Sequence, residues 1–558
     1  MIGSLYNKKT DDTVQSANRV TSRVFHWLAV LAALWFLAST VYGAWLNYSP
    51  VPLSDSWEGI VNFYLRSLTD PWAWWHQHYD HRIFFSKIFF WLDMHYFGGR
   101  NLLLIPLNIA LMLAICWTLY RYALRILGTA SPDVRMLLLA CLSMTSLAWM
   151  QWQNITWEFQ SQFYLVYLFP LLCFYAHGRS VEHGGNAGWA LASLVLGFCS
   201  AFSMANGIFA LPILVLLTAI TTRSWRRTAL VVVAAALAIG LFFFGYEETP
   251  GRKFGPSLLV NHPFKVIAYA LAYLGNPFYW VFGNIQVAVA AGLGAVLLSL
   301  YLLVSPLRRS PFALGLLAYV LFIFCTAGAT AFGRSLFNIE LAASSRYTTP
   351  ALSMWSALLI LVVARWQLRF KAQAAARVLF LLVAALLTGQ QQRALYFHDP
   401  DPISLAPHAK AVLALGLQMG IDDPQAPARL FPFASADEMR RYFGNARQAG
   451  VSIFSAASAF PANSIGQPIA GLQATPCPVE QLDARQVDAA HQASQVQGKL
   501  GSAGGKHYRY VFFVDGEQKV TGVALLGRTV LDTYSLTAGR KLFDGYVFGE
   551  PRVQTYCR

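Results

Sequence analysis

The chain has 558 residues, of which 56% are hydrophobic and only 12% are charged. A soluble domain carries about twice that charged fraction, so water cannot be the solvent around most of this chain. The formal net charge of +15 is compatible with nucleic-acid binding. Arg and Lys gather, however, in short loops between apolar runs, as in the cytoplasmic loops of membrane proteins. We therefore expect a membrane protein with no nucleic-acid partner.

The apolar runs predict an all-α polytopic membrane bundle of about eleven transmembrane helices, because a span needs about twenty apolar residues. The expected spans are 24–46, 101–124, 134–150, 162–177, 187–203, 206–222, 228–246, 285–304, 311–330, 348–364 and 378–396. The segment 263–283 is apolar enough to span as well. Counting it as a span would place Arg308 and Arg365 outside, so a helix at the outer surface or a re-entrant piece fits better.

The arginines between the spans orient the chain. Residues 1–23 carry Lys8, Lys9, Arg19 and Arg23 with no cleavage site after the first apolar run, which indicates a cytoplasmic tail and a retained anchor. Every second loop after that tail is rich in arginine. We expect a multi-pass protein of a bacterial inner (plasma) membrane, with the transmembrane domain at 24–396 and the remainder, 397–558, in the periplasm.

The first outer loop, 47–100, is long and patterned. Its apolar residues Trp57, Ile60, Val61, Tyr64 and Leu65 recur at helical spacing, which predicts an amphipathic helix lying in the membrane interface. A group of tryptophans follows, and a second helix is expected over 81–97. We interpret this loop as a lid that lies on the membrane.

The C-terminal region 397–558 is predicted to be a soluble domain of α+β, β-rich type. Helices are expected at 406–419 and 435–448, and a hairpin joins two strand-like stretches through Asp515 and Gly516. Cys477 and Cys557 bracket the strand-like part, and an oxidising compartment would allow them to form a disulfide.

Three acidic residues in the outer loops are candidates for catalysis: Asp55, Asp80 and Glu158. Asp55 comes directly after the first span, where its carboxylate could accept a proton from a hydroxyl. The alternative is a structural helix cap, with Glu58 completing a capping box. Glu158 likewise suits the start of a helix, or a second carboxylate facing Asp55 across a cavity.

Cations in the outer loops depart from the positive-inside pattern and point to an anionic substrate. Arg346 and Tyr347 lie just before a span, and a guanidinium group is well shaped to bind phosphate oxygens. Further candidates for substrate binding are Glu58, His78, His81, Arg82, Lys87, Arg252, Lys253 and Arg334.

Several familiar sites are missing from the sequence. It has no Walker A motif, no dinucleotide-binding glycine turn on a strand and no hydrolase elbow. The stretch His78–Arg82 has metal-ligating side chains but matches no established metal box, so no metal site is assigned and a divalent metal stays possible. An activated donor used outside the cell must therefore arrive another way, and a lipid-carried phosphosugar is the natural candidate.

The layout resembles the GT-C superfamily of polytopic glycosyltransferases, which use polyprenyl-phosphate sugars. The resemblance covers roughly residues 20–396. It depends on Asp55 after the first span, the His78–Arg82 cluster, Glu158 in the second outer loop and the Ser-Arg-Tyr at 345–347. The Asp55 segment reads Asp-Ser-Trp-Glu instead of Asp-x-Asp, which leaves metal dependence open.

The resemblance implies inverting transfer of a sugar from a polyprenyl-phosphate donor to a glycan, lipid or protein acceptor, with a pentose such as arabinofuranose and a hexose both open as the sugar. Asp55 would act as the base, Arg346 with Arg252 or Lys253 would hold the phosphate, and Glu158 or Asp80 would orient the acceptor. The alternatives are a flippase or transporter of lipid-linked sugars, and an O-antigen ligase or polymerase with a pyrophosphate-linked donor. No charge lies in the middle of an apolar run, which weighs against a transporter.

Overall fold

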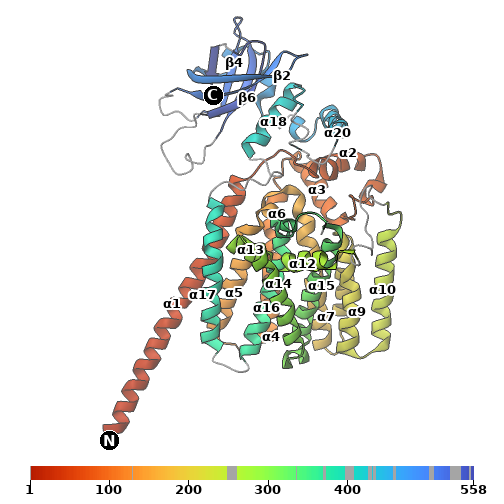
Figure 1. Cartoon of the computed structure of the whole chain (residues 1–558), viewed down its shortest axis with the longest axis vertical. Helices are drawn as coiled ribbons and strands as arrows, with labels where there is room; N and C mark the ends of the chain where they lie inside the picture. Colours follow the sequence, from red (N-terminus) through yellow and green to blue (C-terminus); the bar gives the residue numbers. More distant parts are fainter. Residues whose placement is uncertain are drawn as a thin grey trace.

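The computed structural model describes residues 2–128, 130–247, 261–334, 336–367, 372–395, 407–424, 430, 435–455, 460–501, 508–527, 542–551 and 554–558. Within them, ten helices are long and apolar enough to cross a membrane. They lie at Val20–Leu46, Leu104–Leu127, Pro132–Thr156, Glu158–Glu182, Ala205–Thr222, Trp225–Phe243, Ile285–Leu303, Pro311–Arg334, Ser345–Trp366 and Ala376–Leu395. The predicted multi-pass helical bundle is thus confirmed (Figure 1).

The helices of the bundle are α1 (Ile2–Leu46), α4 (Leu104–Leu127), α5 (Pro132–Ser146), α7 (Ser161–Glu182), α8 (Ala187–Ala201), α9 (Ala210–Thr222), α10 (Trp225–Phe243), α14 (Ile285–Leu303), α15 (Pro311–Arg334), α16 (Thr348–Gln367) and α17 (Ala372–Gln391). The span expected at 187–203 corresponds to α8, which packs against α7. It is apolar, but with 15 residues it is shorter than the ten helices that are long enough to cross a membrane.

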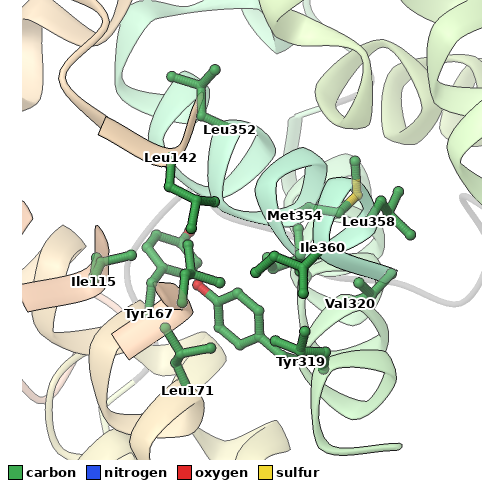
Figure 2. Close-up of a cluster of buried hydrophobic side chains, with 14 of the residues drawn as sticks. Ile115, Leu142, Tyr167, Leu171, Tyr319, Val320, Leu352, Met354, Leu358 and Ile360 are labelled. Carbon is green, nitrogen blue, oxygen red and sulfur yellow. The ribbon is translucent and has the colours of Figure 1, made fainter. Parts of the chain in front are cut away.

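The centre of the bundle is formed by α4, α5, α7, α15 and α16. Figure 2 shows Tyr167 of α7 and Tyr319 of α15 surrounded by aliphatic side chains of α4, α5 and α16, among them Leu142 and Ile360. All four side chains are almost completely buried. Because lipid is as apolar as these residues, close packing of side chains holds such spans together.

The ambiguous segment 263–283 forms two short helices, α12 (Pro263–Leu274) and α13 (Asn276–Phe282), broken at Gly275. With twelve residues, α12 is too short to cross a bilayer. It crosses α14 at backbone distance, since a Cβ on Gly275 would lie 1.8 Å from the Ala288 carbonyl oxygen, and one on Gly292 would lie 2.0 Å from that of Leu271. The glycines are needed for this close crossing.

The first long loop lies over one end of the bundle (Figure 1). It contains a wide helical turn, η1 (Trp57–Asn62), which continues into α2 (Phe63–Ser67), then η2 (Pro71–Trp74) and α3 (Phe84–Phe97). The carboxylate of Asp93 in α3 is fully buried and accepts the backbone N–H of Asn101 (2.9 Å) and of Leu103 (2.8 Å), which fixes the entry into α4. We call this end of the bundle the loop end.

The C-terminal region also lies at the loop end (Figure 1). It contains α18 (Pro407–Met419), α20 (Ala436–Ala449) and a seven-stranded antiparallel sheet with the order β1-β7-β4-β5-β6-β3-β2. The strands are Thr475–Pro476, Val479–Asp488, Ala493–Leu500, Tyr510–Val514, Val520–Leu526, Leu542–Phe548 and Gln554–Cys557. A disulfide joins Cys477 to Cys557, whose Cα atoms are 5.7 Å apart.

The helical part of this region shares a hydrophobic core with the first loop. Trp57 of η1 packs edge-on against Phe443 of α20, with ring centroids 4.7 Å apart. Leu413 and Leu417 of α18 belong to the same buried cluster as Ile60. Protein therefore covers the apolar face of the helix that was predicted to lie in the membrane interface. The sequence could not distinguish the two cases, because a lipid surface and a protein surface select the same spacing of apolar residues.

Candidate functional site

The backbone of Leu53, Ser54 and Asp55 is fixed on several sides. The Leu53 N–H donates to Oε1 of Glu158 (3.1 Å), and the Ser54 N–H donates to the carbonyl of Leu430 (2.6 Å). Ser54 has a φ of +52°, a conformation that costs a non-glycine residue about 1–3 kcal/mol. Such strain persists only where the surroundings enforce it, so the position of Asp55 is tightly determined.

The Asp55 side chain is half-buried, and none of the described residues forms a hydrogen bond or ion pair with its carboxylate. Its backbone carbonyl accepts the N–H of Gly59 (2.7 Å), which starts the helical turn. The capping box expected between Asp55 and Glu58 is not formed, because Glu58 pairs with His78 instead. The carboxylate of Asp55 is left with acceptor capacity.

Glu58 and His78 form an ion pair in which the imidazole is 4% exposed and the Glu58 side chain 28% exposed. Burial alone would raise the pKa of Glu58, but the positive charge of His78 and its hydrogen bond outweigh burial and hold that pKa below its ordinary value. Burial alone would lower the pKa of His78, but Glu58 and, to a smaller extent, Asp55 raise it above its ordinary value. Both shifts favour the charged forms of the pair.

Asp80 lies in a tight turn. The backbones of His78 and His81 exchange two hydrogen bonds (2.8 and 2.9 Å), and Tyr79 adopts a φ of +47° between them. Asp80 is 7% exposed. Nδ1 of His81 accepts the N–H of Ala205 (3.4 Å), so the imidazole contacts the bundle.

Arg82 and Lys87 are buried and occupied with backbone carbonyls. Arg82 donates to Trp75 and Phe242 (2.6 Å each) and to Phe244, which ties the loop to the end of α10. Lys87 donates to Ala73 (2.8 Å) and His76. Burial lowers the pKa of Lys87 to about 7. These contacts give both residues a structural function within the loop.

Glu158 is 2% exposed and interacts with Ser56 as well as with the Leu53 N–H. The positive charge that interacts with it electrostatically is that of Lys410 in α18, which is itself only 7% exposed. Burial lowers the pKa of Lys410, and the charge of Glu158 opposes that shift. Glu158 therefore supports the chain beside Asp55 and connects it with the C-terminal region.

Arg346 enters the same region from the segment before α16. Its backbone is held by two amides, since its N–H donates to Gln153 (3.1 Å) and its carbonyl accepts from Asn154 (2.8 Å). The guanidinium lies over the ring of Tyr347 at 5.2 Å. Its Nε is buried without a hydrogen-bond partner among the described residues. The Asp55 carboxylate is close enough to interact with the guanidinium electrostatically.

A second cation and a buried hydroxyl accompany Arg346. Arg334, in the last turn of α15, and Arg346 both act electrostatically on Tyr269 of α12. The Tyr269 hydroxyl is also buried without a partner among the described residues. Two cations and unpaired donors at one place are suited to an anion with several oxygens.

Two of the candidate cations are not described by the structure, and the sequence left a divalent metal open. Arg252 and Lys253 lie outside the described residues. Among the residues that the structure does describe, no group of three or more His, Cys, Asp and Glu side chains could hold a metal ion. Glu58 and His78 supply two such side chains and are paired with each other.

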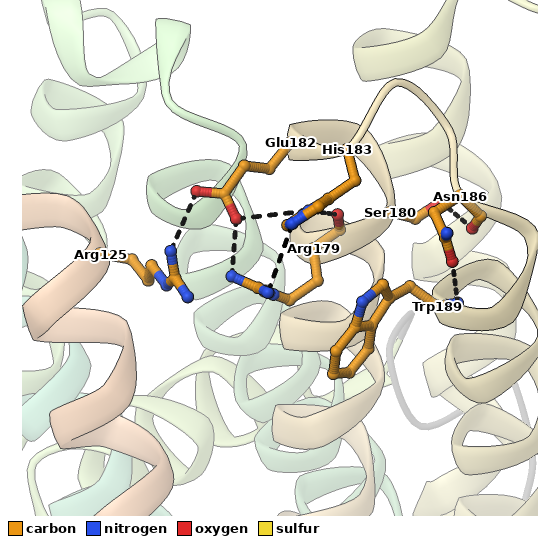
Figure 3. Close-up of polar contacts among 7 residues, drawn as sticks. All are labelled: Arg125, Arg179, Ser180, Glu182, His183, Asn186 and Trp189. Atoms are coloured by element: carbon orange, nitrogen blue, oxygen red, sulfur yellow. Dashed lines mark hydrogen bonds and ion pairs between the residues drawn. The ribbon is translucent and has the colours of Figure 1, made fainter.

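The opposite end of the bundle carries a group of charged residues that includes two arginines. Glu182 of α7 binds Arg179 (2.8 Å) and Arg125 of α4 (3.3 Å), and Figure 3 shows His183 and Trp189 beside this group. We call it the arginine end. All the paired charges in this group are partly exposed.

Sequence reasoning missed three members of the site: Lys410, Leu430 and Tyr269. Lys410 lies in a helix whose neighbours at 412–415 are all apolar, which is a signal that the helix is enclosed. Leu430 contributes only a backbone carbonyl, for which a sequence carries no signal.

No protein-family model matches the chain, and a comparison with curated proteins found no match. Among solved structures, the chain is similar to the crystal structure of the Archaeoglobus fulgidus oligosaccharyltransferase in complex with Zn and sulfate. The match has 14% sequence identity and a TM-score of 0.43, and it covers 74% of this chain but only 56% of the other. A similarity of this size is loose, and the assignment of chemistry depends on the residues of the site.

Proposed function

We propose that the protein transfers a sugar from a polyprenyl-phosphate donor to an acceptor hydroxyl, with inversion at the anomeric carbon. The observation that carries the proposal is that the Asp55 carboxylate and the Arg346 guanidinium lie within electrostatic reach of each other at the loop end, although distant segments of the chain supply them. Among the described residues, no group forms a hydrogen bond with that carboxylate or with Nε of Arg346. The resemblance of the sequence to the GT-C superfamily supports the same function.

The step needs one base and one anion site. The acceptor oxygen attacks the anomeric carbon while its proton passes to the Asp55 carboxylate. The bond from that carbon to the phosphate oxygen breaks, and its electron pair leaves with the polyprenyl phosphate. Arg346 and Arg334, with the Tyr269 hydroxyl, bind the phosphate and stabilise the charge it gains. A single displacement on this pattern inverts the configuration.

The remaining polar groups act around Asp55. Glu58 and His78 fix the loop behind it, and Glu158 acts through the backbone of Leu53. Asp80, in the turn between His78 and His81, would orient the acceptor. We expect the loop end on the periplasmic side of the plasma membrane, because the arginine end carries the charges of cytoplasmic loops. The lipid chain of the donor would lie between spans.

The proposal is tested with purified protein in proteoliposomes that contain radiolabelled polyprenyl-monophosphate pentose or hexose. The assay measures the label in added glycan, lipid or peptide acceptors together with the polyprenyl phosphate released. Transfer with equal release supports the proposal. Transfer only from pyrophosphate-linked donors would assign a ligase or polymerase instead. Movement of labelled lipid across the bilayer without a new glycosidic bond would assign a flippase.

A further inference from the structure

We propose that α18, Leu430 and α20 of the C-terminal region are a working component of the site, in which Lys410 is a positioning residue for Asp55. The inference builds on the proposed function. It differs from the expectation of a separate soluble domain. It is carried by three independent links between these helices and the segment that bears Asp55: a backbone hydrogen bond, an electrostatic interaction and apolar packing.

The first contact is made by the backbone. Ser54 directly precedes Asp55 and has a left-handed conformation, and its N–H donates to the Leu430 carbonyl at 2.6 Å. A strained residue of this kind is held in place by the group that receives its hydrogen bond. The C-terminal region therefore supplies a constraint one residue away from the base.

The second link is electrostatic. Glu158 accepts the N–H of Leu53 at 3.1 Å and is 2% exposed, and Lys410 of α18, which is 7% exposed, acts on the charge of Glu158. A buried charge is costly without an opposite charge near it, so each of the two stabilises the other. The interaction links α18 to the residue two positions before Asp55.

The third contact is apolar. Phe443 and Met439 of α20 and Leu413 of α18 pack with Trp57 and Ile60 of η1 in one buried cluster. Lys410 lies on the same helix as Leu413, and its charge acts on Glu158, whose carboxylate is one hydrogen bond from the backbone of Leu53. The charge of Lys410 therefore bears on the geometry of the segment that carries Asp55.

Removing the charge of Lys410 should disturb Asp55 in a defined way. Glu158 would be left as a buried, uncompensated carboxylate and would turn towards water. Leu53 would then lose its acceptor, and the carboxylate of Asp55 would move relative to the donor. A displacement of about 1 Å can cost about 100-fold in rate. The affinity for the donor should change little, because Arg346 and Arg334 do not depend on this contact.

The test compares Lys410→Met with the double variant Lys410→Met/Glu158→Gln in the full-length protein. A glutamine still accepts the Leu53 N–H through its oxygen but carries no charge that needs a partner. We expect Lys410→Met to lower kcat by about 100-fold with KM for the donor nearly unchanged. The double variant should recover most of that loss. Lys519→Met, the same change at an exposed lysine on the β-sheet, is the matched control and should behave as wild type.

A second measurement does not depend on turnover. Hydrogen exchange at residues 51–60 should be faster in Lys410→Met than in wild type, and the double variant should restore protection. A Lys410→Met chain that fails to fold while the double variant folds is also the expected effect of an uncompensated Glu158. Unchanged exchange, an unchanged kcat, or a double variant no better than Lys410→Met overturns the inference. If wild type transfers no sugar from any donor, the proposed function fails, and the exchange result still decides the positioning role.

Discussion

Glu58 and His78 form an ion pair directly beside Asp55, and the His78 imidazole is 4% exposed. The two residues come from different turns of the first loop, and Gly59 leaves room for the ring, since a Cβ there would lie 3.3 Å from Cε1 of His78. Phe159 covers the other side, with its ring centroid 4.9 Å from that of His78. His78 is therefore enclosed, and because its pKa and that of Glu58 are shifted in opposite directions, the contribution of the pair to stability depends on pH.

We predict that the pair stabilises the protein in a limited range of pH. The pKa of His78 is raised, so its contribution is fully present below pH 6.5 and is lost as pH rises through the raised value. The pKa of Glu58 is lowered, so its contribution is present above pH 4.5 and is lost as pH falls. His78→Gln should therefore lower the melting temperature most between these values, corresponding to about 1.5–3 kcal/mol.

The measurement is thermal unfolding of the detergent-solubilised protein across this range and up to pH 9. His183→Gln at the arginine end serves as the control, because that imidazole is 46% exposed. A destabilisation by His78→Gln that is the same at pH 5.5 and pH 9 would contradict the assignment.

Asp55→Asn should nearly abolish transfer while leaving the fold intact. Its carboxylate has no hydrogen bond to any described residue, so the amide removes only the capacity to accept a proton. The loss of a general base lowers kcat by about 100- to 10,000-fold. Melting temperature should stay at the wild-type value. Asp437→Asn, at an exposed carboxylate of α20, is the control for turnover; near-normal turnover in Asp55→Asn would remove this residue from the role.

Arg346→Met should weaken stabilisation of the leaving phosphate and lower kcat/KM by about 100- to 1,000-fold. Arg346→Lys keeps the charge but loses the flat fork of donors, so it should recover only part of the activity. Turnover is measured with the polyprenyl-monophosphate donor. Arg125→Met, which breaks a partly exposed pair at the arginine end, should leave kcat/KM unchanged. Equal activities of Arg346→Met and Arg125→Met would be incompatible with a phosphate site.

Gly59→Ala should destabilise the loop by about 1–3 kcal/mol through overpacking. A Cβ at this position would lie 2.4 Å from the Phe159 ring, which is 1% exposed and stacked on Phe90 at 5.2 Å. Gly444→Ala in α20 is the matched control. Nothing lies within 4 Å of a Cβ there, and an alanine in a helix should add about 0.5–1 kcal/mol. Unfolding in denaturant measures the stability of both variants. A Gly59→Ala protein that is as stable as Gly444→Ala would contradict the prediction, because the Phe159 ring would then move aside at no cost.

The spans and the hairpin in the C-terminal sheet were readable from the sequence because they depend on local patterns. About twenty apolar residues in one unbroken helix specify a span, and the Asp515–Gly516 turn lies between strands β4 and β5 as predicted. Helical spacing also placed a helix at Trp57–Ser67. It did not show that α20 covers that helix, because an apolar stripe does not record whether lipid or protein covers it.

The candidate site was harder to predict from the sequence. Acidic and basic residue types in the outer loops pointed to Asp55, Glu158 and Arg346 as residues of interest, since charge near a membrane is costly without a use. Nothing local predicted that Arg82 and Lys87 would be occupied by backbone carbonyls, or that Lys410 would lie buried against Glu158. A lysine in a short helix is normally solvated, and only its surroundings decide otherwise.

The sequence by itself determined that this chain must cross a membrane many times and which residues carry charge between its spans. Both follow from composition and order along the chain, because each segment partitions into lipid or water according to its own residues. The tertiary structure alone decided that Asp55 lies within electrostatic reach of Arg346 and that Leu430 accepts the hydrogen bond of Ser54. These relationships join segments far apart in the chain, and their distances depend on how the whole bundle and the C-terminal helices pack.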